Sequence, residues 1–168
     1  GDAAGAVLFS ADDNGGKMLA YELGADGTGA MHITSLAVRN DEEELEKRVS
    51  GRKETIWMAG QPVMKFAVKT MADATGRVLV KAGLTYDDIK LIVPHQANYR
   101  IVDSALQRMG VEKDKVLLTL EKYGNTSSSC VPVALTEAVK SGRIQRGDKV
   151  VVVGFGGGLT WAAAVFEF

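Results

Sequence analysis

Leu91-Ile-Val-Pro-His-Gln-Ala-Asn-Tyr-Arg100 is the stretch that decides the fold of this chain. Its apolar start predicts a buried strand over residues 89–93. From Asn98 to Met109 the apolar positions follow helical spacing, and Gly110 is a typical helix stop. His95 therefore stands where a central strand gives way to a helix, which is the edge at which open α/β sheets bind ligands.

Two further polar turns resemble this one in placement. Tyr123-Gly-Asn-Thr-Ser-Ser-Ser129 follows a predicted strand over residues 115–120, and Gly154-Phe-Gly-Gly-Gly158 follows the β-branched run at 149–153. If the three turns converge, they form one polar pocket on an otherwise ordinary globular body.

The rest of the chain supplies the layers around these turns. Gly60-Gln-Pro62 is typical of a helix start, and we expect the longest helix from there to Gly83. The other expected elements are strands at 3–10, 18–23, 31–38 and 160–168, a short exposed acidic helix at 41–48, a capping-box turn at 85–88 and a helix from 127 to 142. Alternation of strand and helix from residue 84 onward predicts an α/β layered fold.

Composition excludes several classes of protein. The 168 residues are enough for one domain, and the 20 basic and 21 acidic residues leave a net charge of −1, so no overall field favours nucleic acid. The single cysteine, Cys130, excludes an internal disulfide framework and a cysteine-rich metal site. No apolar run approaches the length of a membrane span. We therefore expect a cytoplasmic protein with no nucleic-acid or membrane partner and no metal.

His95 and Asn125 are the candidates for chemistry. An imidazole and a carboxamide can each donate one hydrogen bond to the same thioester or ketone oxygen, which would stabilise an enolate. In the alternative interpretation, the His95 side chain only forms hydrogen bonds with backbone groups of its loop, and Asn125 occupies a left-handed turn beside Gly124. Spacing alone leaves both open.

Three other features are explained at least as well by a structural role as by a functional one. The glycine turn at 154–158 departs from a dinucleotide fingerprint, because a strand rather than a helix follows it; it could form an oxyanion site or a tight hairpin. Cys130 could be a nucleophile partnered by His95. However, it opens a predicted helix, so we expect a buried, inert thiol whose side chain faces away from Asn125. His32 has no second histidine, cysteine or carboxylate at the spacing of a metal site, so we expect a surface histidine or a core histidine with its hydrogen bonds satisfied.

Three motifs together carry a resemblance to a known family. His95-Gln-Ala-Asn98, Gly124-Asn-Thr-Ser127 and Gly154-Phe-Gly-Gly-Gly-Leu-Thr-Trp161 closely resemble the C-terminal half of the β-ketoacyl-acyl carrier protein (ACP) synthases III, which are thiolase-like condensing enzymes. The opening Gly1-Asp-Ala-Ala-Gly-Ala-Val7 is also similar to a strand of that family. The likeness covers residues 1–168 in register.

The resemblance implies a thiolase-like layered sandwich, of which this chain would be the C-terminal half: a mixed sheet with helices packed on it. It implies decarboxylative Claisen condensation of a short acyl-CoA primer with malonyl-ACP, the step that initiates fatty acid biosynthesis. The implied substrates are CoA and ACP thioesters, with no resident cofactor. The implied partners are ACP, acyl-CoA, the N-terminal half of the same enzyme and a second copy in a homodimer.

The resemblance also implies roles for single residues. His95 and Asn125 resemble the catalytic pair that holds the malonyl thioester oxygen. Gln61 stands where the family commonly has asparagine. The other implied roles are the oxyanion backbone at Gly157, the aromatic beside the nucleophile at Phe155, support at Asn98, the substrate pocket at Gly60, Gln61 and Met64, and ACP docking at Lys65 and Arg100.

The family's nucleophilic cysteine has no counterpart within the chain. We expect it upstream of Gly1, in an N-terminal domain absent from this chain, so that the chain alone is inactive. Two alternatives stay open: a related condensing enzyme of secondary metabolism, and a non-catalytic ACP-binding module.

Overall fold

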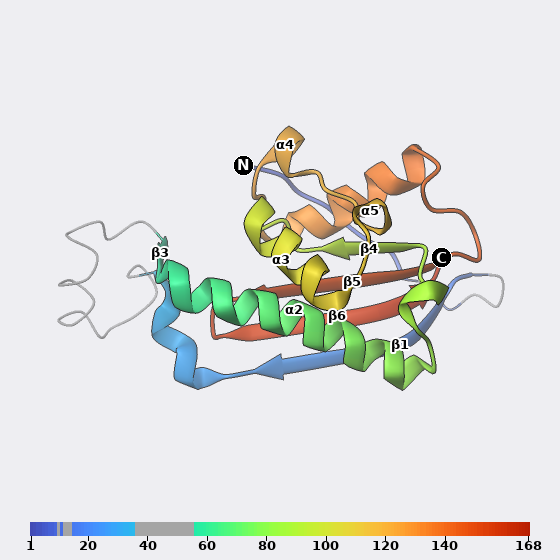
Figure 1. Cartoon of the computed structure of the whole chain (residues 1–168). Helices are drawn as coiled ribbons and strands as arrows, with labels where there is room; N and C mark the ends of the chain where they lie inside the picture. Colours follow the sequence, from blue (N-terminus) through green and yellow to red (C-terminus); the bar gives the residue numbers. More distant parts are fainter. Residues whose placement is uncertain (10, 12–14, 36–55) are drawn as a thin grey trace.

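The structure, a computed structural model, describes residues 1–9, 11, 15–35 and 56–168. Its main sheet has four strands: β1 (Lys17–Ala25), β4 (Leu91–Pro94), β5 (Lys149–Gly156) and β6 (Thr160–Glu167). The strand order is β1-β6-β5-β4, and β4 runs parallel to β5 while the other neighbours are antiparallel. A small antiparallel pair joins β2 (Ile33–Ser35) to β3 (Ile56–Met58). This mixed sheet, with helices packed on it, confirms the expected α/β class (Figure 1).

Capping residues set the helix ends where the sequence predicts them. The long helix α2 (Gly60–Ala82) ends at Gly83 and α3 (Tyr99–Met109) ends at Gly110, both glycines being left-handed with φ of 69° and 67°. Asn98 caps the start of α3, since its side chain accepts a hydrogen bond from the Ile101 N–H. The remaining helices are α4 (Leu120–Tyr123) and α5 (Cys130–Lys140), with 3₁₀ turns η1 (Gly27–His32), η3 (Tyr86–Asp88), η4 (Lys113–Lys115) and η5 (Ser127–Ser129).

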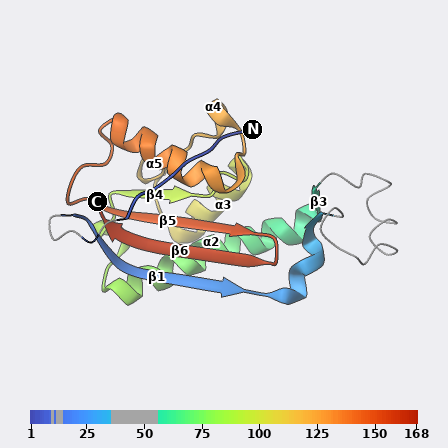
Figure 2. The ribbon, with the colours of Figure 1, turned by 180° about the vertical axis from the view of Figure 1, so that it is seen from behind.

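Alternate residues of the central strands build two separate cores. Ile92, Val151 and Val165 face α2 and α3, and they share one apolar cluster with those helices. Leu91 and Val150 point to the opposite face, where Ala134 and Ala138 of α5 cover them. Figure 2 shows α5 on this second face near β4, while no helix of the described residues lies over β6 and β1 there. The two-residue period of the strands thus places one helix pair on one side and α5 on the other.

The second face of β1 and β6 exposes apolar side chains. Tyr21 is 63% exposed and Leu23 is 73% exposed, and they stand opposite Ala164 and Ala162 across the β1–β6 pairing. Large apolar side chains clustered on one open sheet face are typical of a surface that another protein layer covers.

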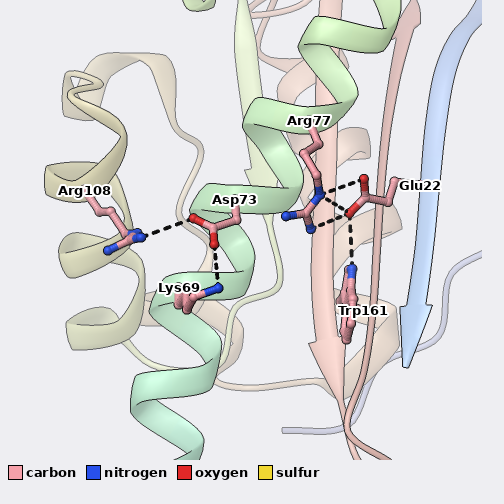
Figure 3. A network of polar contacts seen from close by, with 6 residues as sticks. All are labelled: Glu22, Lys69, Asp73, Arg77, Arg108 and Trp161. Atoms are coloured by element: carbon pink, nitrogen blue, oxygen red, sulfur yellow. Dashed lines mark hydrogen bonds and ion pairs between the residues drawn. The ribbon is translucent and has the colours of Figure 1, made fainter. Parts of the chain in front are cut away.

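Polar contacts tie α2 to its neighbours on the first face (Figure 3). The buried Glu22 carboxylate of β1 accepts hydrogen bonds from Arg77 Nε at 2.8 and 2.9 Å and from the Trp161 indole N–H at 3.3 Å. The Arg77 guanidinium holds the pKa of Glu22 below its usual value. One turn before Arg77 in α2, Asp73 accepts a hydrogen bond from Arg108 of α3. These contacts join the sheet, α2 and α3 into one unit.

Three strand predictions need correction. Residues 115–120 form no strand but a 3₁₀ turn, a single bridge from Val116 to Ile92, and the start of α4. The physical reason is that the buried Gln96 side chain bonds the backbone of Leu117 and Thr119, which a strand would have used for pairing. Of the predicted strand at 3–10, residues 3–9 form no strand and pair with none in the described chain, and residue 10 lies outside the described residues.

The third correction concerns the predicted strand at 31–38, which begins only at Ile33 because His32 completes the turn η1. Residues 36–38 of that prediction lie outside the described residues. The predicted helix at 41–48 lies outside the described residues. The other predicted elements are confirmed, including the capping box of Thr85 and Asp88. Across the described ranges, no helix is both long and apolar enough to cross a membrane.

Candidate functional site

The turns that follow β4 and β5 meet at one edge of the sheet. Because the two strands are parallel, their carboxyl ends lie side by side, and the His95 N–H donates to the Val153 carbonyl at 2.7 Å. The His95 ring stands edge-on to the Phe155 ring, with centroids 5.3 Å apart. The third turn joins them, since the Asn125 side chain donates to the Ala97 carbonyl at 3.3 Å. The three turns therefore converge, which is the condition that the sequence analysis set for a shared polar pocket.

The Asn125 carboxamide is held in one orientation. Its oxygen accepts the Ser127 N–H at 2.9 Å, and one of its two N–H groups donates to Ala97. Gly124, with φ of 70°, supplies the positive-φ backbone that starts this turn, a conformation that favours glycine. The oxygen is therefore engaged within the turn, and the second N–H of the carboxamide can donate to a ligand.

Burial lowers the pKa of His95 and so favours the neutral imidazole at pH 7. Its Nδ1 lies 3.1 Å from the Cys130 sulfur, so Nε2 is the ring nitrogen left for a ligand. The expectation that Cys130 is buried is confirmed. The sequence analysis considered Cys130 beside His95 only as a nucleophile and preferred an inert thiol, whereas the structure places this buried thiol against the candidate catalytic histidine.

A hollow of about 1300 Å³ opens over this edge of the sheet. Its lining includes five of the predicted site residues: His95, Asn98, Asn125, Phe155 and Gly157. The hollow continues over the exposed face of β1 and β6, where Tyr21 and Leu23 also line it. A site of this form can present two hydrogen-bond donors to an oxygen beside a largely apolar wall.

The predicted pocket and docking residues lie elsewhere. Of the first turn of α2, Val63 lines the hollow, whereas Gly60, Gln61 and Met64 do not. Met64 instead packs against the core under α2. Lys65 and Arg100 are exposed, and neither lines the hollow. Within the described part of the chain, no three His, Cys, Asp or Glu side chains gather as they would around a metal ion.

Sequence reasoning missed the role of Gln96. This residue is fully buried, and its amide donates to the carbonyls of Pro94 and Leu117 at 3.0 Å each while its oxygen accepts the Thr119 N–H at 3.1 Å. It therefore ties the His95 turn to the segment that leads to Asn125. The sequence did contain a signal for this role: Gln96 directly follows the candidate histidine, in a turn between two apolar elements.

Replacing Gln96 by leucine, which is similar in size, should lower the free energy of unfolding by about 3 kcal/mol. Two buried backbone groups and one partly buried group would lose their partners, and each unsatisfied buried group costs about 1–3 kcal/mol before relaxation. Urea denaturation measures this loss. Gln107→Leu is the matched control, because Gln107 is exposed on α3 and should change stability by about 0.5 kcal/mol or less. Equal losses in the two variants would contradict this role of Gln96.

Comparison with known proteins agrees with the family resemblance found in the sequence. The family described as "3-Oxoacyl-[acyl-carrier-protein (ACP)] synthase III C terminal" matches residues 79–168. β-Ketoacyl-ACP synthase III 1 of Bacillus cereus is 44% identical over 168 residues, which are all of this chain and 49% of that protein. The chain thus spans about half the length of the relatives it matches.

Solved structures share the fold. β-Ketoacyl-ACP synthase III from Thermus thermophilus is similar with a TM-score of 0.81 and 44% identity, over 92% of this chain and 47% of that one. The priming β-ketosynthase from the R1128 polyketide biosynthetic pathway is similar with a TM-score of 0.76 and 34% identity, over 88% of this chain and 44% of that one. These likenesses support the expected thiolase-like arrangement of the sheet and helices.

Proposed function

Because the chain belongs to the β-ketoacyl-ACP synthase III family, as the C-terminal part of such a protein, we propose that it supplies the enolate-stabilising half of a condensing active site. The observation that carries this proposal is the convergence of His95 and Asn125 on one hollow, each with a side-chain nitrogen left for a ligand. The whole protein would join a short acyl-CoA primer to malonyl-ACP and so initiate fatty acid synthesis.

The chemistry follows from two donors aimed at one oxygen. When the bond between the malonyl methylene and its carboxylate breaks, CO₂ leaves and the electron pair passes into an enolate. His95 Nε2–H and the Asn125 N–H would hold the enolate oxygen in a site from which water is largely excluded. The enolate carbon then attacks the acyl thioester on the nucleophilic cysteine, and the cysteine leaves as a thiolate. No step calls for a resident cofactor.

The nucleophile in this proposal comes from an N-terminal half that lies on the open sheet face. Its support is the exposed apolar surface of Tyr21 and Leu23, together with Leu8 and Phe9, which are 92% and 79% exposed. A covering half would bury this surface and would close the hollow that His95 and Asn125 share. The whole protein would then be a cytoplasmic acyltransferase, with a homodimer as its expected assembly.

A condensation assay with the protein that contains this chain tests the proposal. The assay follows 3-ketoacyl-ACP formation from acetyl-CoA and malonyl-ACP. Product that depends on both substrates supports it. A protein that binds ACP and releases neither CO₂ nor ketoacyl product would instead be a binding module.

A second candidate is a related condensing enzyme of a polyketide pathway, and the likeness to the R1128 priming ketosynthase favours it. Both candidates use the same pair of donors, so His95 and Asn125 do not separate them. Primer preference and the identity of the carrier protein separate them, because a priming ketosynthase would prefer the carrier protein of its own pathway.

Charge reversal at Arg100 should raise the KM for malonyl-ACP by at least about fivefold. Arg100 is exposed in the first turn of α3, between Asn98 and Ile101, which both line the hollow, and a basic side chain there would favour encounter with an acidic carrier. Lys65 of α2 should act in the same direction. The measurement compares Arg100→Glu in assays with malonyl-ACP and with malonyl-CoA.

The control for this prediction is Lys90→Glu, because Lys90 is exposed at the opposite end of β4. It should leave both KM values unchanged. If Arg100→Glu shifts the KM for malonyl-CoA as much as that for malonyl-ACP, Arg100 does not contact the carrier.

A further inference from the structure

The Cys130 thiol lies in a place that the proposed chemistry does not use. Cys130 is the first residue of α5 and is only 1% exposed. Its sulfur lies 3.1 Å from His95 Nδ1 and accepts the backbone N–H of Gln96 at 3.3 Å. The thiol thus contacts two groups of one turn: the ring of His95 and the backbone N–H of Gln96.

The positions of these donors and acceptors decide where the protons lie. A neutral imidazole has one N–H and one bare nitrogen, and a thiol has one S–H donor and a weakly accepting sulfur. The sulfur already accepts the Gln96 N–H. If Nδ1 also carried a proton, two donors would point at one weak acceptor, and the buried S–H would lose the acceptor in contact with it. The arrangement S–H···Nδ1 satisfies both groups.

Burial keeps both partners in these neutral forms. It lowers the pKa of His95 and raises that of Cys130, so a thiolate–imidazolium pair is disfavoured at neutral pH. The geometry is therefore that of a neutral donor and a neutral acceptor. A carboxylate in the place of the thiol would act differently, because it would accept a hydrogen bond from a protonated Nδ1 and its charge would favour the charged ring.

We propose that Cys130 is a positioning residue whose thiol donates to Nδ1 and so keeps His95 in the tautomer with its proton on Nε2. That tautomer is the one that presents an N–H donor to a substrate oxygen. The inference deepens the proposed function and rests on it for the substrate. The proton position itself is a property of the protein and can be measured without substrate.

The direct test is ¹⁵N NMR of the histidine rings. The chain has only two histidines, so His32→Gln leaves His95 as the sole labelled ring. We expect the proton on Nε2 and a bare Nδ1 in this background. Cys130→Ala should give a mixture of the two tautomers, and Cys130→Ser should restore the Nε2–H form, because a hydroxyl can donate as the thiol does.

Val133→Ala is the matched control, since Val133 lies on the same turn of α5 and does not line the hollow. It should leave both ring nitrogens unchanged. Two results would overturn the proposal: a proton on Nδ1 with Cys130 intact, or an unchanged Nε2–H form in Cys130→Ala. The first needs no Cys130 variant, so the proposal is testable even if Cys130→Ala does not fold.

Kinetics of the protein that contains this chain provide an independent readout. Cys130→Ala should lower kcat for malonyl decarboxylation by about three- to tenfold, the range that one neutral hydrogen bond accounts for, with little change in KM. Cys130→Ser should recover most of the rate. A kcat unchanged in Cys130→Ala would contradict the positioning role. Absence of decarboxylation in the unaltered protein would instead refute the proposed function, while the NMR result would still decide the tautomer.

Discussion

Replacing His95 or Asn125 by alanine should lower the rate of malonyl decarboxylation by about 10²–10³ in the protein that contains this chain. Each replacement removes one of the two donors that would hold the enolate oxygen, and loss of one such donor costs about 2.7–4 kcal/mol of transition-state stabilisation. Asn125→Asp should be at least as harmful, because it places an acceptor where a donor is needed. Release of CO₂ from malonyl-ACP measures the effect.

Acylation by the primer should survive these replacements better than decarboxylation does. The two donors act on the malonyl oxygen, whereas acylation depends on the nucleophilic cysteine and its surroundings. The matched control is His32→Ala, because His32 does not line the hollow and should leave both half-reactions unchanged. Equal losses of acylation and decarboxylation in the His95 and Asn125 variants would contradict this division of labour.

The parts of the structure that follow from local rules could be predicted from the sequence. The ends of α2 and α3 follow from glycines that take left-handed backbone, and Asn98 caps α3 by a local hydrogen bond. Convergence of His95 and Phe155 follows from the parallel pairing of β4 and β5. Each of these conclusions needs only periodicity, a cap or the geometry of adjacent strands.

The rest depends on contacts between segments distant in the sequence. Residues 115–120 have the composition of a strand, but the side chain of Gln96 takes up backbone groups that pairing would have used. The direction of the Cys130 side chain depends on how α5 packs over β4 through Ala134 and its neighbours, and spacing from Asn125 does not contain that information. In both places a contact between segments distant in the sequence decides the structure, and the local pattern does not contain it.

Cys130 should not become acylated, which is the second large effect that we expect. Acyl transfer needs a thiolate close to the acyl carbon, and burial raises the pKa of this thiol and keeps it protonated. Its sulfur is also engaged by His95 and Gln96, so attack would require breaking both contacts. The acyl group of the primer should therefore reside on a cysteine outside this chain.

Intact-mass spectrometry of this chain after incubation with acetyl-CoA tests the division of the active site most directly, because covalent acetylation appears as added mass. We predict no stoichiometric acetylation of the chain. In the protein that contains it, peptide mapping should place the acetyl group on a cysteine outside residues 1–168. Stoichiometric acetylation of Cys130, discharged when malonyl-CoA is added, would contradict the account and make Cys130 the nucleophile.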